Sequence, residues 1–450
     1  MARFTSVFVA LAFCLSLFTT AISSPSFPLK SGKTFSLPVA HNADAPRHGP
    51  TEYLKTLKKY KLDIPEGLQE TVDAHKAAIK TNKAVGDDSG GSAQAASRDG
   101  DLLWLTPVGI GSPPQPLYLD LDSGSSDTWV FSTDTNTEEV AGQTLWDPSK
   151  SSTSQKINNC TWSIIYGDYS TSEGICYKDT LTLGNLSIPN MTVESAESVS
   201  SMFTESSYMS GLVGLAWSSI IQTIPKQKSL LDYLPLVLSQ PLFTVDLRHN
   251  SSEGSFNFGF INDSLHNSDI EYVNVNNSLG YWAVQQTGFS IGGSDIKYEF
   301  DEAEDVVIDT GSTLFYAPAE AVRMYFNSVP GANYSYREYG WVLPCNSTPP
   351  DFIFELGDAE GNRITGSVPG AYFIYAHSTD ESCYAGLQTL GSFTDMPSIF
   401  GDVFLKSGFA VFDIAKKRFG MASKPLNTSN EKQEVVARHE SGGDDGESGS

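Results

Sequence analysis

The chain is 450 residues long, which is more than one typical domain holds, so length alone favours two or three domains. Its 40% hydrophobic and 11% aromatic residues suffice for large buried cores, and this composition excludes a wholly disordered protein. The formal net charge of −24 repels the phosphate backbone of nucleic acids, so we expect no DNA- or RNA-binding function.

The N-terminus has the pattern of a secretory signal peptide. Arg3 precedes a short, mostly apolar run over 7–18, and small residues follow the run up to Ser23. A membrane anchor is the alternative, but the run is shorter than the roughly 20 apolar residues that a spanning helix needs. We therefore predict a signal peptide over 1–23, a secreted protein with a vacuolar destination as the alternative, and no membrane partner. Nine Asn-x-Ser/Thr sequons fit the same secretory route.

The next part of the chain, 24–98, differs from the rest in charge. It contains 11 basic and 8 acidic residues, whereas the residues from 99 onward contain 17 and 45. Its stretch 51–60 has tyrosines and leucines at helical spacing, and 86–97 is a Gly/Ser-rich stretch typical of an exposed, cleavable linker. We interpret 24–98 as a removable basic pro-segment, because its low apolar content argues against an independent domain.

From about Leu102 the sequence becomes a series of short β-branched and aromatic runs separated by Gly, Pro, Asn and Ser. This pattern predicts an all-β fold with few helices. The expected elements include strands over 116–121, 161–166, 193–195 and 243–247 and a short helix over 319–327.

An internal repeat indicates two homologous lobes. The motif Asp122-Ser-Gly-Ser, which ends an apolar run, resembles Asp309-Thr-Gly-Ser. A second motif of two apolar residues and a glycine follows each aspartate after the same interval of 92 residues, at Gly214 and Gly401. Two unrelated motifs that recur at one spacing indicate a duplicated structure. The predicted divisions of the body are a first lobe over 99–285, a second lobe over 286–424 and a polar tail over 425–450.

A strand that ends in Asp-Ser/Thr-Gly presents a carboxylate at a tight turn. The glycine lets a second backbone approach closely, and the hydroxyl can satisfy buried backbone groups across the contact. Two such turns placed face to face bring together two carboxyls, which cannot both ionise cheaply and therefore share one proton. One carboxyl then acts as a base toward a trapped water while the other donates to a carbonyl, so Asp122 and Asp309 are candidate catalytic residues.

Six motifs together resemble the pepsin family of aspartic proteases, in its secreted fungal-type branch, and the resemblance covers 102–424. They are Pro107-Val-Gly-Ile-Gly111, Asp122-Ser-Gly-Ser-Ser-Asp-Thr-Trp-Val130, Tyr166-Gly-Asp168, Gly211-Leu-Val-Gly-Leu-Ala216, Asp309-Thr-Gly-Ser312 and Ile399-Phe-Gly-Asp-Val-Phe404. The resemblance implies a bilobal, pepsin-like double β-barrel fold with pseudo-twofold related lobes and a central cleft. It implies an endopeptidase that hydrolyses proteins or peptides in acid as a monomer, with no cofactor and no metal.

The resemblance also assigns roles within the two turns. Asp122 and Asp309 are the expected catalytic pair, and beneath them Ser123 and Thr310 form a crossed grip in which each hydroxyl bonds the backbone of the other lobe. The family usually has threonine in both grip positions, so Ser123 keeps the hydroxyl and loses a methyl group. We expect altered packing and retained activity. The expected substrate-contacting residues of the turns, whose serines also bond the outer carboxylate oxygens, are Gly124, Ser125, Gly311 and Ser312.

A hairpin with its tip near Asp168 is expected to fold over the bound peptide, as the flap of the family does. The resemblance gives substrate contacts to Tyr166, Gly167 and Asp168, and a hydrogen bond between Trp129 and Tyr166. Asp168 resembles the flap aspartate that lets some fungal-type members accept lysine beside the scissile bond. Tyr169 stands where those members have glycine, which puts the geometry of the tip and the acceptance of lysine in question.

Cys14 leaves with the signal peptide, and the four remaining cysteines can pair in three ways. Sequence position favours Cys160–Cys176 and Cys345–Cys383. The first pair flanks the expected flap hairpin, and the second matches the disulfide in the second lobe of the family. Free thiols are the alternative, but an exported protein meets an oxidising environment.

The resemblance further implies that the pro-segment is an intramolecular inhibitor at neutral pH. Lys59 is the candidate lysine for a salt bridge with the ionised catalytic pair. Acid is expected to weaken that contact and to allow cleavage near 94–99.

Other function classes fit less well. A glycosidase also uses two carboxylates but does not need the Asp-Ser/Thr-Gly-Ser turn twice. A catalytically silent binding or inhibitor protein on the same fold is the alternative, although the aspartates, the grip hydroxyls and the flap tyrosine are all present. The sequence has no Gly-x-Ser-x-Gly motif of a serine hydrolase, and its scattered histidines lack the spacing of metal ligands.

Overall fold

The computed structural model describes most of the chain. The described residues are 32–41, 47–85, 104–167, 169–204, 208–251, 254–292, 294, 296–391 and 396–428. The predicted signal peptide, the Gly/Ser-rich linker and Asp168 lie outside them, as does most of the predicted tail. In the described part strands predominate and form four sheets, which confirms the predicted all-β fold class.

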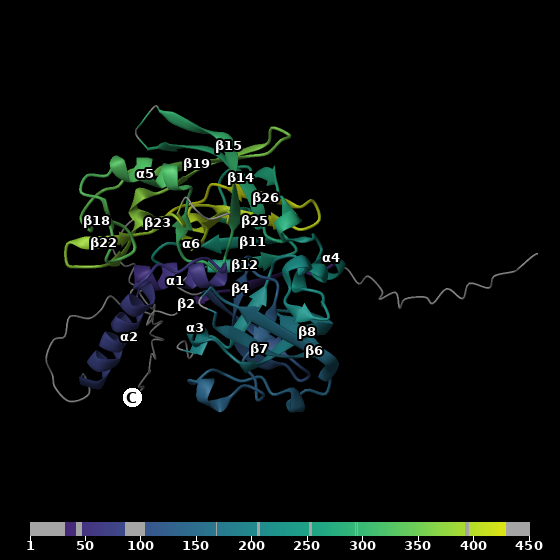
Figure 1. Cartoon of the computed structure of the whole chain (residues 1–450). Coiled ribbons are helices and arrows are strands. Elements are labelled where there is room, and N and C mark those ends of the chain that lie inside the picture. The colour runs from purple at the N-terminus through teal and green to yellow at the C-terminus, as the bar shows by residue number, and fades with distance from the viewer. Residues whose placement is uncertain are drawn as a thin grey trace, which may run out of the picture. The chain divides into compact units, whose positions relative to one another are not determined.

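A nine-stranded sheet forms the first lobe, whose strands β6, β7 and β8 are labelled in the lower part of Figure 1. Buried and more exposed residues alternate along β7, because one face of this strand packs on the core while the other faces outward. The spatial order of the strands is β10 (Thr223–Ile224), β6 (Gln155–Ile165), β7 (Thr171–Leu183), β8 (Leu186–Ser198), β5 (Thr128–Val130), β9 (Gly211–Gly214), β4 (Gln115–Asp122), β3 (Trp104–Ile110) and β2 (Ala40–His41).

Two sheets form the second lobe, in the upper part of Figure 1. The larger has the order β20 (Arg363–Val368), β19 (Phe352–Gly357), β14 (Ala283–Ile291), β15 (Lys297–Ile308), β24 (Ser398–Phe400), β16 (Phe315–Tyr316) and β23 (Leu387–Gln388). The smaller has the order β17 (Asn333–Ser335), β18 (Gly340–Pro344), β22 (Ser382–Ala385) and β21 (Ile374–His377). The predicted boundary between residues 285 and 286 falls inside β14.

A six-stranded sheet joins the two halves of the body. Its order is β1 (Phe35–Pro38), β12 (Gly254–Phe258), β11 (Leu242–Leu247), β25 (Phe409–Asp413), β26 (Arg418–Ala422) and β13 (Glu271–Asn274). The fully buried Trp282 packs edge-on against Phe243 of β11 and Phe412 of β25, with ring centroids 5.7 and 5.0 Å away. The lobes therefore share one hydrophobic core at this sheet.

The internal repeat corresponds to the same strand pairing in both lobes. In the first lobe β4 runs parallel to β9, and Asp122 lies opposite Gly214. In the second lobe β15 runs parallel to β24, and Ile308 lies opposite Phe400, so that Asp309 and Gly401 follow at matching positions. The duplicated spacing in the sequence is thus a duplicated register in the structure.

The N-terminal segment, defined here as the described residues of 32–85, enters the sheets of the body. The strand β1 lies along β12, and the ring of Phe35 stacks on that of Phe258 at 4.9 Å. The helix α1 (Gly49–Lys59) falls on the predicted helical stretch, with proline in its first turn and lysines in its last, as helix ends favour. Three elements of this segment, the strands β1 and β2 and the helix α2 (Leu68–Val85), were not predicted.

The remaining expected elements of the body are present. The strands β4, β8 and β11 cover the predicted runs, β6 ends one residue before the end of its predicted run, and α5 has the predicted bounds, Ala319–Asn327. Other short helices are α3 (Ser201–Thr204), α4 (Leu234–Val237) and α6 (Asp402–Leu405). None of the described helices is long and apolar enough to cross a membrane.

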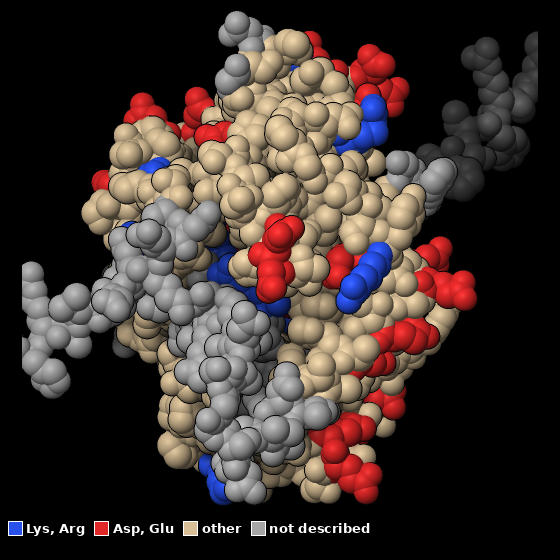
Figure 2. All heavy atoms as spheres, turned by 90° about the vertical axis from the view of Figure 1, so that its left-hand side faces the viewer, with Lys and Arg blue, Asp and Glu red and all other residues tan. Residues whose placement is uncertain are grey.

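Acidic side chains are spread over the face seen in Figure 2, and basic ones are fewer. This distribution agrees with the excess of acidic residues that the sequence shows from residue 99 onward.

Both predicted disulfides, Cys160–Cys176 and Cys345–Cys383, are confirmed. The first joins β6 and β7 near the middle of their hairpin, since Thr161 pairs with Ile175.

Replacing both Cys160 and Cys176 with alanine removes a cross-link over a sequence separation of 16 residues. We expect the free energy of unfolding to fall by about 2–4 kcal/mol, because the unfolded chain gains conformational freedom. Urea unfolding of the intact chain measures this change, and the Cys345→Ala/Cys383→Ala variant gives a matched comparison in the second lobe. An unchanged unfolding midpoint would contradict the expectation.

Candidate active site

The two predicted carboxylates meet between the lobes, each at the end of a strand. Asp122 ends β4 and Asp309 follows β15, and their relative exposures are 1% and 0%. The Gly124 amide donates to Oδ1 of Asp122 at 2.8 Å, and the Ser125 hydroxyl donates to its Oδ2 at 2.7 Å. These two bonds fix the carboxylate plane within its own turn.

The turn of the second lobe repeats this arrangement around Asp309. The Gly311 amide donates to Oδ1 of Asp309 at 2.9 Å, and the Ser312 hydroxyl donates to its Oδ2 at 2.5 Å. The two serines therefore bond the carboxylate oxygens as expected, and the two turns are related by the internal repeat.

The crossed grip beneath the carboxylates is present. The Ser123 amide donates to Oγ1 of Thr310, and the Thr310 amide donates to Oγ of Ser123, both at 2.9 Å. Each hydroxyl then donates onward to a carbonyl of the opposite lobe, Ser123 to Ile308 at 2.9 Å and Thr310 to Leu121 at 2.6 Å. The amides and hydroxyls of Ser123 and Thr310 are thus all buried and hydrogen-bonded. The grip therefore holds the two turns in register even though Ser123 lacks the methyl of threonine.

Glycine in each turn is required by the other carboxylate. A Cβ at Gly124 would come within 2.5 Å of Oδ1 of Asp309, and a Cβ at Gly311 would collide with Oδ1 of Asp122. The absence of a side chain therefore lets each carboxylate sit against the backbone of the opposite turn.

The expected flap corresponds to the hairpin of β6 and β7. Tyr166 is buried beneath it, and Tyr169 at the tip is 88% exposed with φ of +62°, a left-handed conformation that is uncommon for a bulky residue. In the described part of the chain, Trp129 and Tyr166 do not share the expected hydrogen bond. Phe203 instead packs between them, with ring centroids 4.9 Å from Trp129 and 5.6 Å from Tyr166.

The cation between the carboxylates comes from the end of α1. Nζ of Lys59 lies 2.8 Å from Oδ1 of Asp122 and 3.1 and 2.9 Å from Oδ1 and Oδ2 of Asp309. This is the lysine that the sequence indicated. Tyr60 had no predicted role, yet its hydroxyl donates to Oδ2 of Asp309 at 2.8 Å.

The main chain of the N-terminal segment also contacts the flap. The Gly167 amide donates to the Lys58 carbonyl at 2.8 Å, which is a backbone bond of the kind a peptide could make. Farther along α1, the Thr313 hydroxyl donates to the Glu52 carboxylate at 2.9 Å. Figure 1 shows α1 between strands of the two lobes.

A cavity of about 220 Å³ continues from the carboxylates beneath the flap. Its wall is largely apolar on the side of the first lobe, so it suits an apolar side chain. Lining residues on that side include Tyr166, Phe203, Met209, Leu212 and Ile220.

The two carboxyls have opposite tendencies to ionise. Burial raises the pKa of Asp122 to about 6, although the Lys59 ammonium opposes the shift. Burial acts in the same direction on Asp309, but Lys59 and hydrogen bonds from Asp122 and Ser312 outweigh it and lower the pKa of Asp309 to about 2. The surroundings thus favour the protonated form of Asp122 and the ionised form of Asp309, which is the asymmetry that an acid/base pair requires.

A second carboxyl pair, which the sequence did not indicate, lies at the wall of the cavity, which Asp127 lines. Asp127 and Glu194 are 3% and 0% exposed, and the Gln222 amide donates to Oδ1 of Asp127 at 2.7 Å. Burial raises the pKa of Asp127 to about 6 despite that bond, and burial followed by the neighbouring Asp127 raises the pKa of Glu194 well above its usual range.

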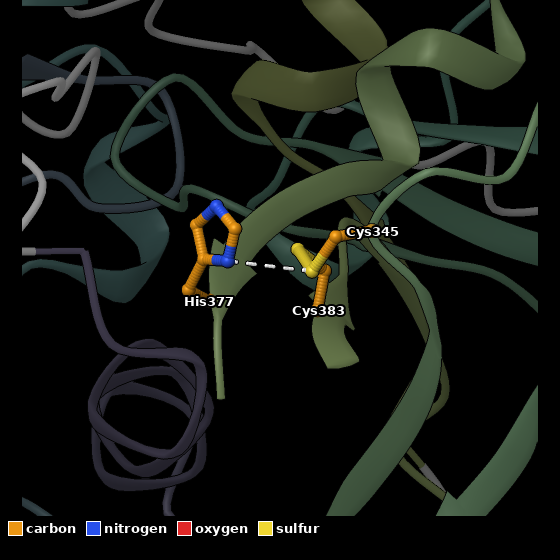
Figure 3. A group of neighbouring side chains, drawn as sticks. All are labelled: Cys345, His377 and Cys383. Carbon is orange, nitrogen blue, oxygen red and sulfur yellow. Dashed lines mark hydrogen bonds between the residues drawn. A yellow bond between two sulfur atoms is a disulfide. The ribbon is translucent and has the colours of Figure 1, made fainter. Parts of the chain in front are cut away.

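One histidine lies beside the second disulfide, as Figure 3 shows. Nδ1 of His377 is 3.4 Å from Sγ of Cys345. The three side chains are close enough to hold a metal ion, but the two sulfurs bond each other and so are not available as thiolate ligands.

Comparison with known proteins gives consistent matches. A model of the family described as eukaryotic aspartyl protease matches residues 103–424. The chain is 39% identical to endothiapepsin of Cryphonectria parasitica, with 87% of this chain and 90% of the relative covered. It is 38% identical to podosporapepsin of Podospora anserina, covering 83% and 86%, and 37% identical to aspergillopepsin-1 of Aspergillus oryzae, covering 79% and 88%.

The Asp127–Glu194 pair predicts that the body loses stability as pH rises. Both pKa values are raised in the folded state, so the contribution of the pair is complete below the ordinary carboxyl pKa and is lost as pH rises past about 6. We expect Glu194→Gln to recover about 1 kcal/mol or more at pH 8, because it removes one of two neighbouring buried negative charges.

Urea unfolding midpoints at pH 5 and pH 8 test this expectation. Glu320→Gln is the matched control, because its side chain is 68% exposed. If Glu194→Gln and the parent chain lose stability equally between the two pH values, the pair is not responsible for the loss.

Proposed function

This chain belongs to the eukaryotic aspartyl protease family and hydrolyses peptide bonds, and from that premise we propose that Asp122 and Asp309 are its catalytic pair. The observation that carries the proposal is the buried, pseudo-twofold arrangement in which each carboxylate is held by its own turn and lies against the glycine of the other. The substrates are proteins or peptides, and the alternative of a silent binding protein has no support in the relatives.

The geometry supports a general acid/base mechanism. The carboxyl that carries the proton donates a hydrogen bond to the scissile carbonyl, while the ionised carboxyl accepts a proton from an attacking water. Ser125 and Ser312 hold the outer oxygens, so the inner oxygens stay directed at the substrate. The Lys59 ammonium, which contacts both aspartates, occupies the position that we assign to the water.

The flap and the cavity supply the contacts that position the peptide. The Gly167 amide, which now bonds the Lys58 carbonyl, would bond a carbonyl of the substrate in the same way. The apolar cavity under Tyr166 would take a side chain beside the scissile bond. These features favour cleavage next to apolar residues.

The N-terminal segment is the inhibitory pro-segment in this proposal. Lys59 and Tyr60 occupy the carboxylates, β1 pairs with the body, and Lys58 fills the flap contact, so no peptide can reach the pair while the segment is bound. We further propose that the chain is exported through its N-terminal signal peptide, is cleaved in the linker after α2, and acts as a monomer.

Replacing either aspartate tests the catalytic assignment. We expect Asp122→Asn and Asp309→Asn each to lower kcat for a peptide substrate by roughly 10²–10⁴-fold at pH 4, because each variant removes one partner of the acid/base pair. The variants are matured by an added protease, so that loss of self-cleavage does not confuse the assay. Asp263→Asn, whose parent side chain is 96% exposed, serves as the control.

Two outcomes would overturn the assignment. Hydrolysis that survives the loss of either carboxyl would place catalysis elsewhere. A matured wild-type chain that binds peptides in acid without cleaving them would instead favour the silent binding protein.

Lys59 is expected to keep the precursor inactive at neutral pH. In Lys59→Ala two buried carboxylates lose their cation. Removing one partner of a buried ion pair typically destabilises the arrangement that contains it by about 3–5 kcal/mol, so the segment should leave the cleft more readily. We expect faster conversion of the precursor at pH 6, followed by mass spectrometry.

The matched control for this variant is Lys55→Ala. This variant removes the same charge from the same helix. The parent Lys55 ammonium pairs with Glu52 and not with the catalytic carboxylates. Equal conversion rates in the two variants would exclude Lys59 as the inhibitory contact.

A further inference from the structure

Two histidines of the N-terminal segment are stacked on each other. The imidazole rings of His48 and His75 have centroids 3.7 Å apart and planes inclined by only 6°. His48 directly precedes α1, and its Nδ1 lies 2.8 Å from Oγ1 of Thr51, while His75 lies on α2. The stacked pair therefore joins the two helices near the N-terminal end of α1.

No negative charge compensates this pair among the residues that the structure describes. Neither imidazole is in an ion pair with a carboxylate of the described residues, and Nε2 of His75 is buried without a hydrogen-bond partner. The nearby carboxylate of α1, Glu52, is bonded to Lys55 and Thr313.

The other groups around the pair add no compensating charge. Arg47, next to His48 in the chain, is itself a cation and donates to the Tyr375 carbonyl of β21 at 3.2 Å. From β22 the ring of Tyr384 lies against Gly49, and its pKa is raised well above its usual range by burial, so it stays neutral. Among the described groups, a proton on one imidazole would therefore face the other imidazole.

Burial and mutual proximity keep both rings neutral at pH 7. Burial, followed by the neighbouring His75, lowers the pKa of His48 to about 3, and burial also lowers that of His75. A lowered pKa means that the folded arrangement is favoured above the ordinary histidine pKa and is progressively disfavoured as pH falls toward 3. That interval covers the acid conditions in which the enzyme is proposed to work.

We propose that the stacked His48–His75 pair is an acid-sensitive contact whose protonation opens the α1–α2 unit and releases the pro-segment from the catalytic cleft. The inference rests on the proposed inhibitory function of this segment and adds a trigger located in the segment itself. It assigns to these two histidines a role separate from the titration of the catalytic carboxyls.

The connection from the pair to the cleft runs along α1. Tyr53, Leu54 and Leu57 of α1 pack with Leu68 and Val72 of α2 in one buried cluster that also includes residues of the second lobe. Positive charges on stacked rings repel each other, and a cation at the start of a helix opposes the helix dipole. Protonation thus weakens the packing of the helix whose far end holds Lys59 against the carboxylates.

The test follows opening of the segment in a precursor that cannot cleave itself. In an Asp122→Asn background, hydrogen–deuterium exchange of peptides covering 47–60 is measured between pH 7 and pH 3 and corrected for intrinsic exchange. The parent should show an acid-driven rise in exchange. His48→Asn/His75→Phe removes both titrating rings, places a residue that favours the N-cap position before α1 and keeps one aromatic ring at the contact, and its opening should move about one pH unit lower or more.

A fixed charge gives the converse test. His75→Lys should expose 47–60 already at pH 7, with exchange roughly tenfold faster than in the parent, since the charge is present without acid. His377→Asn, which removes an exposed histidine in the second lobe, should leave the profile unchanged.

An opening profile of His48→Asn/His75→Phe that coincides with the parent would overturn the proposal. Failure of the proposed function would look different. When His48→Asn/His75→Phe is made in the chain that keeps Asp122, the matured body has the wild-type sequence, so loss of its peptide hydrolysis would count against the catalytic assignment and not against the histidine pair.

Discussion

The structure depends on one electrostatic constraint, namely that two fully buried carboxyls in adjacent turns cannot both be charged unless a cation joins them. Burial disfavours the ionised form of each carboxyl, and once one carboxyl is ionised its charge disfavours ionisation of the other. The features around Asp122 and Asp309 satisfy this constraint: each carboxylate accepts bonds from its own glycine amide and serine hydroxyl, and the grip of Ser123 and Thr310 keeps the turns from separating.

The N-terminal segment satisfies the same constraint in a different way. Lys59 supplies the cation, and the raised pKa of this lysine, which the two aspartates cause against the effect of burial, keeps it charged. The segment thus stabilises the doubly ionised pair, whereas catalysis needs one shared proton. Inhibition and catalysis are therefore two protonation states of one site, and acid favours the catalytic one. The proposed histidine pair makes the inhibitory N-terminal segment, as well as the catalytic carboxyls, respond to pH.

Much of this arrangement could be predicted from the sequence because it lies in local motifs. The Asp-Ser/Thr-Gly-Ser turns fix the carboxylates, and their recurrence with Gly214 and Gly401 at one interval predicted two homologous lobes, in which the structure shows the same parallel pairing. Lys59 could be named because the resemblance to the family implies an inhibitory lysine in the basic segment.

Other features depend on contacts between residues far apart in the chain, and no local sequence pattern predicts them. The strand β1 forms only because β12 offers an edge, and the Asp127–Glu194 pair arises where β5 lies beside β8. Phe203 comes between Trp129 and Tyr166 from a helix of one turn, α3, that carries no repeat or motif. The stacking of His48 on His75 likewise needs α2, whose packing against α1 the sequence did not indicate.

The pH dependence of kcat/KM for the matured enzyme tests the shared proton most directly. A pair that works with one proton is inactive when both carboxyls are protonated and when both are ionised, so the rate should fall on both sides of an acidic optimum. A rate that rises or falls in one direction only across the acid range, with the enzyme still folded, would contradict the account.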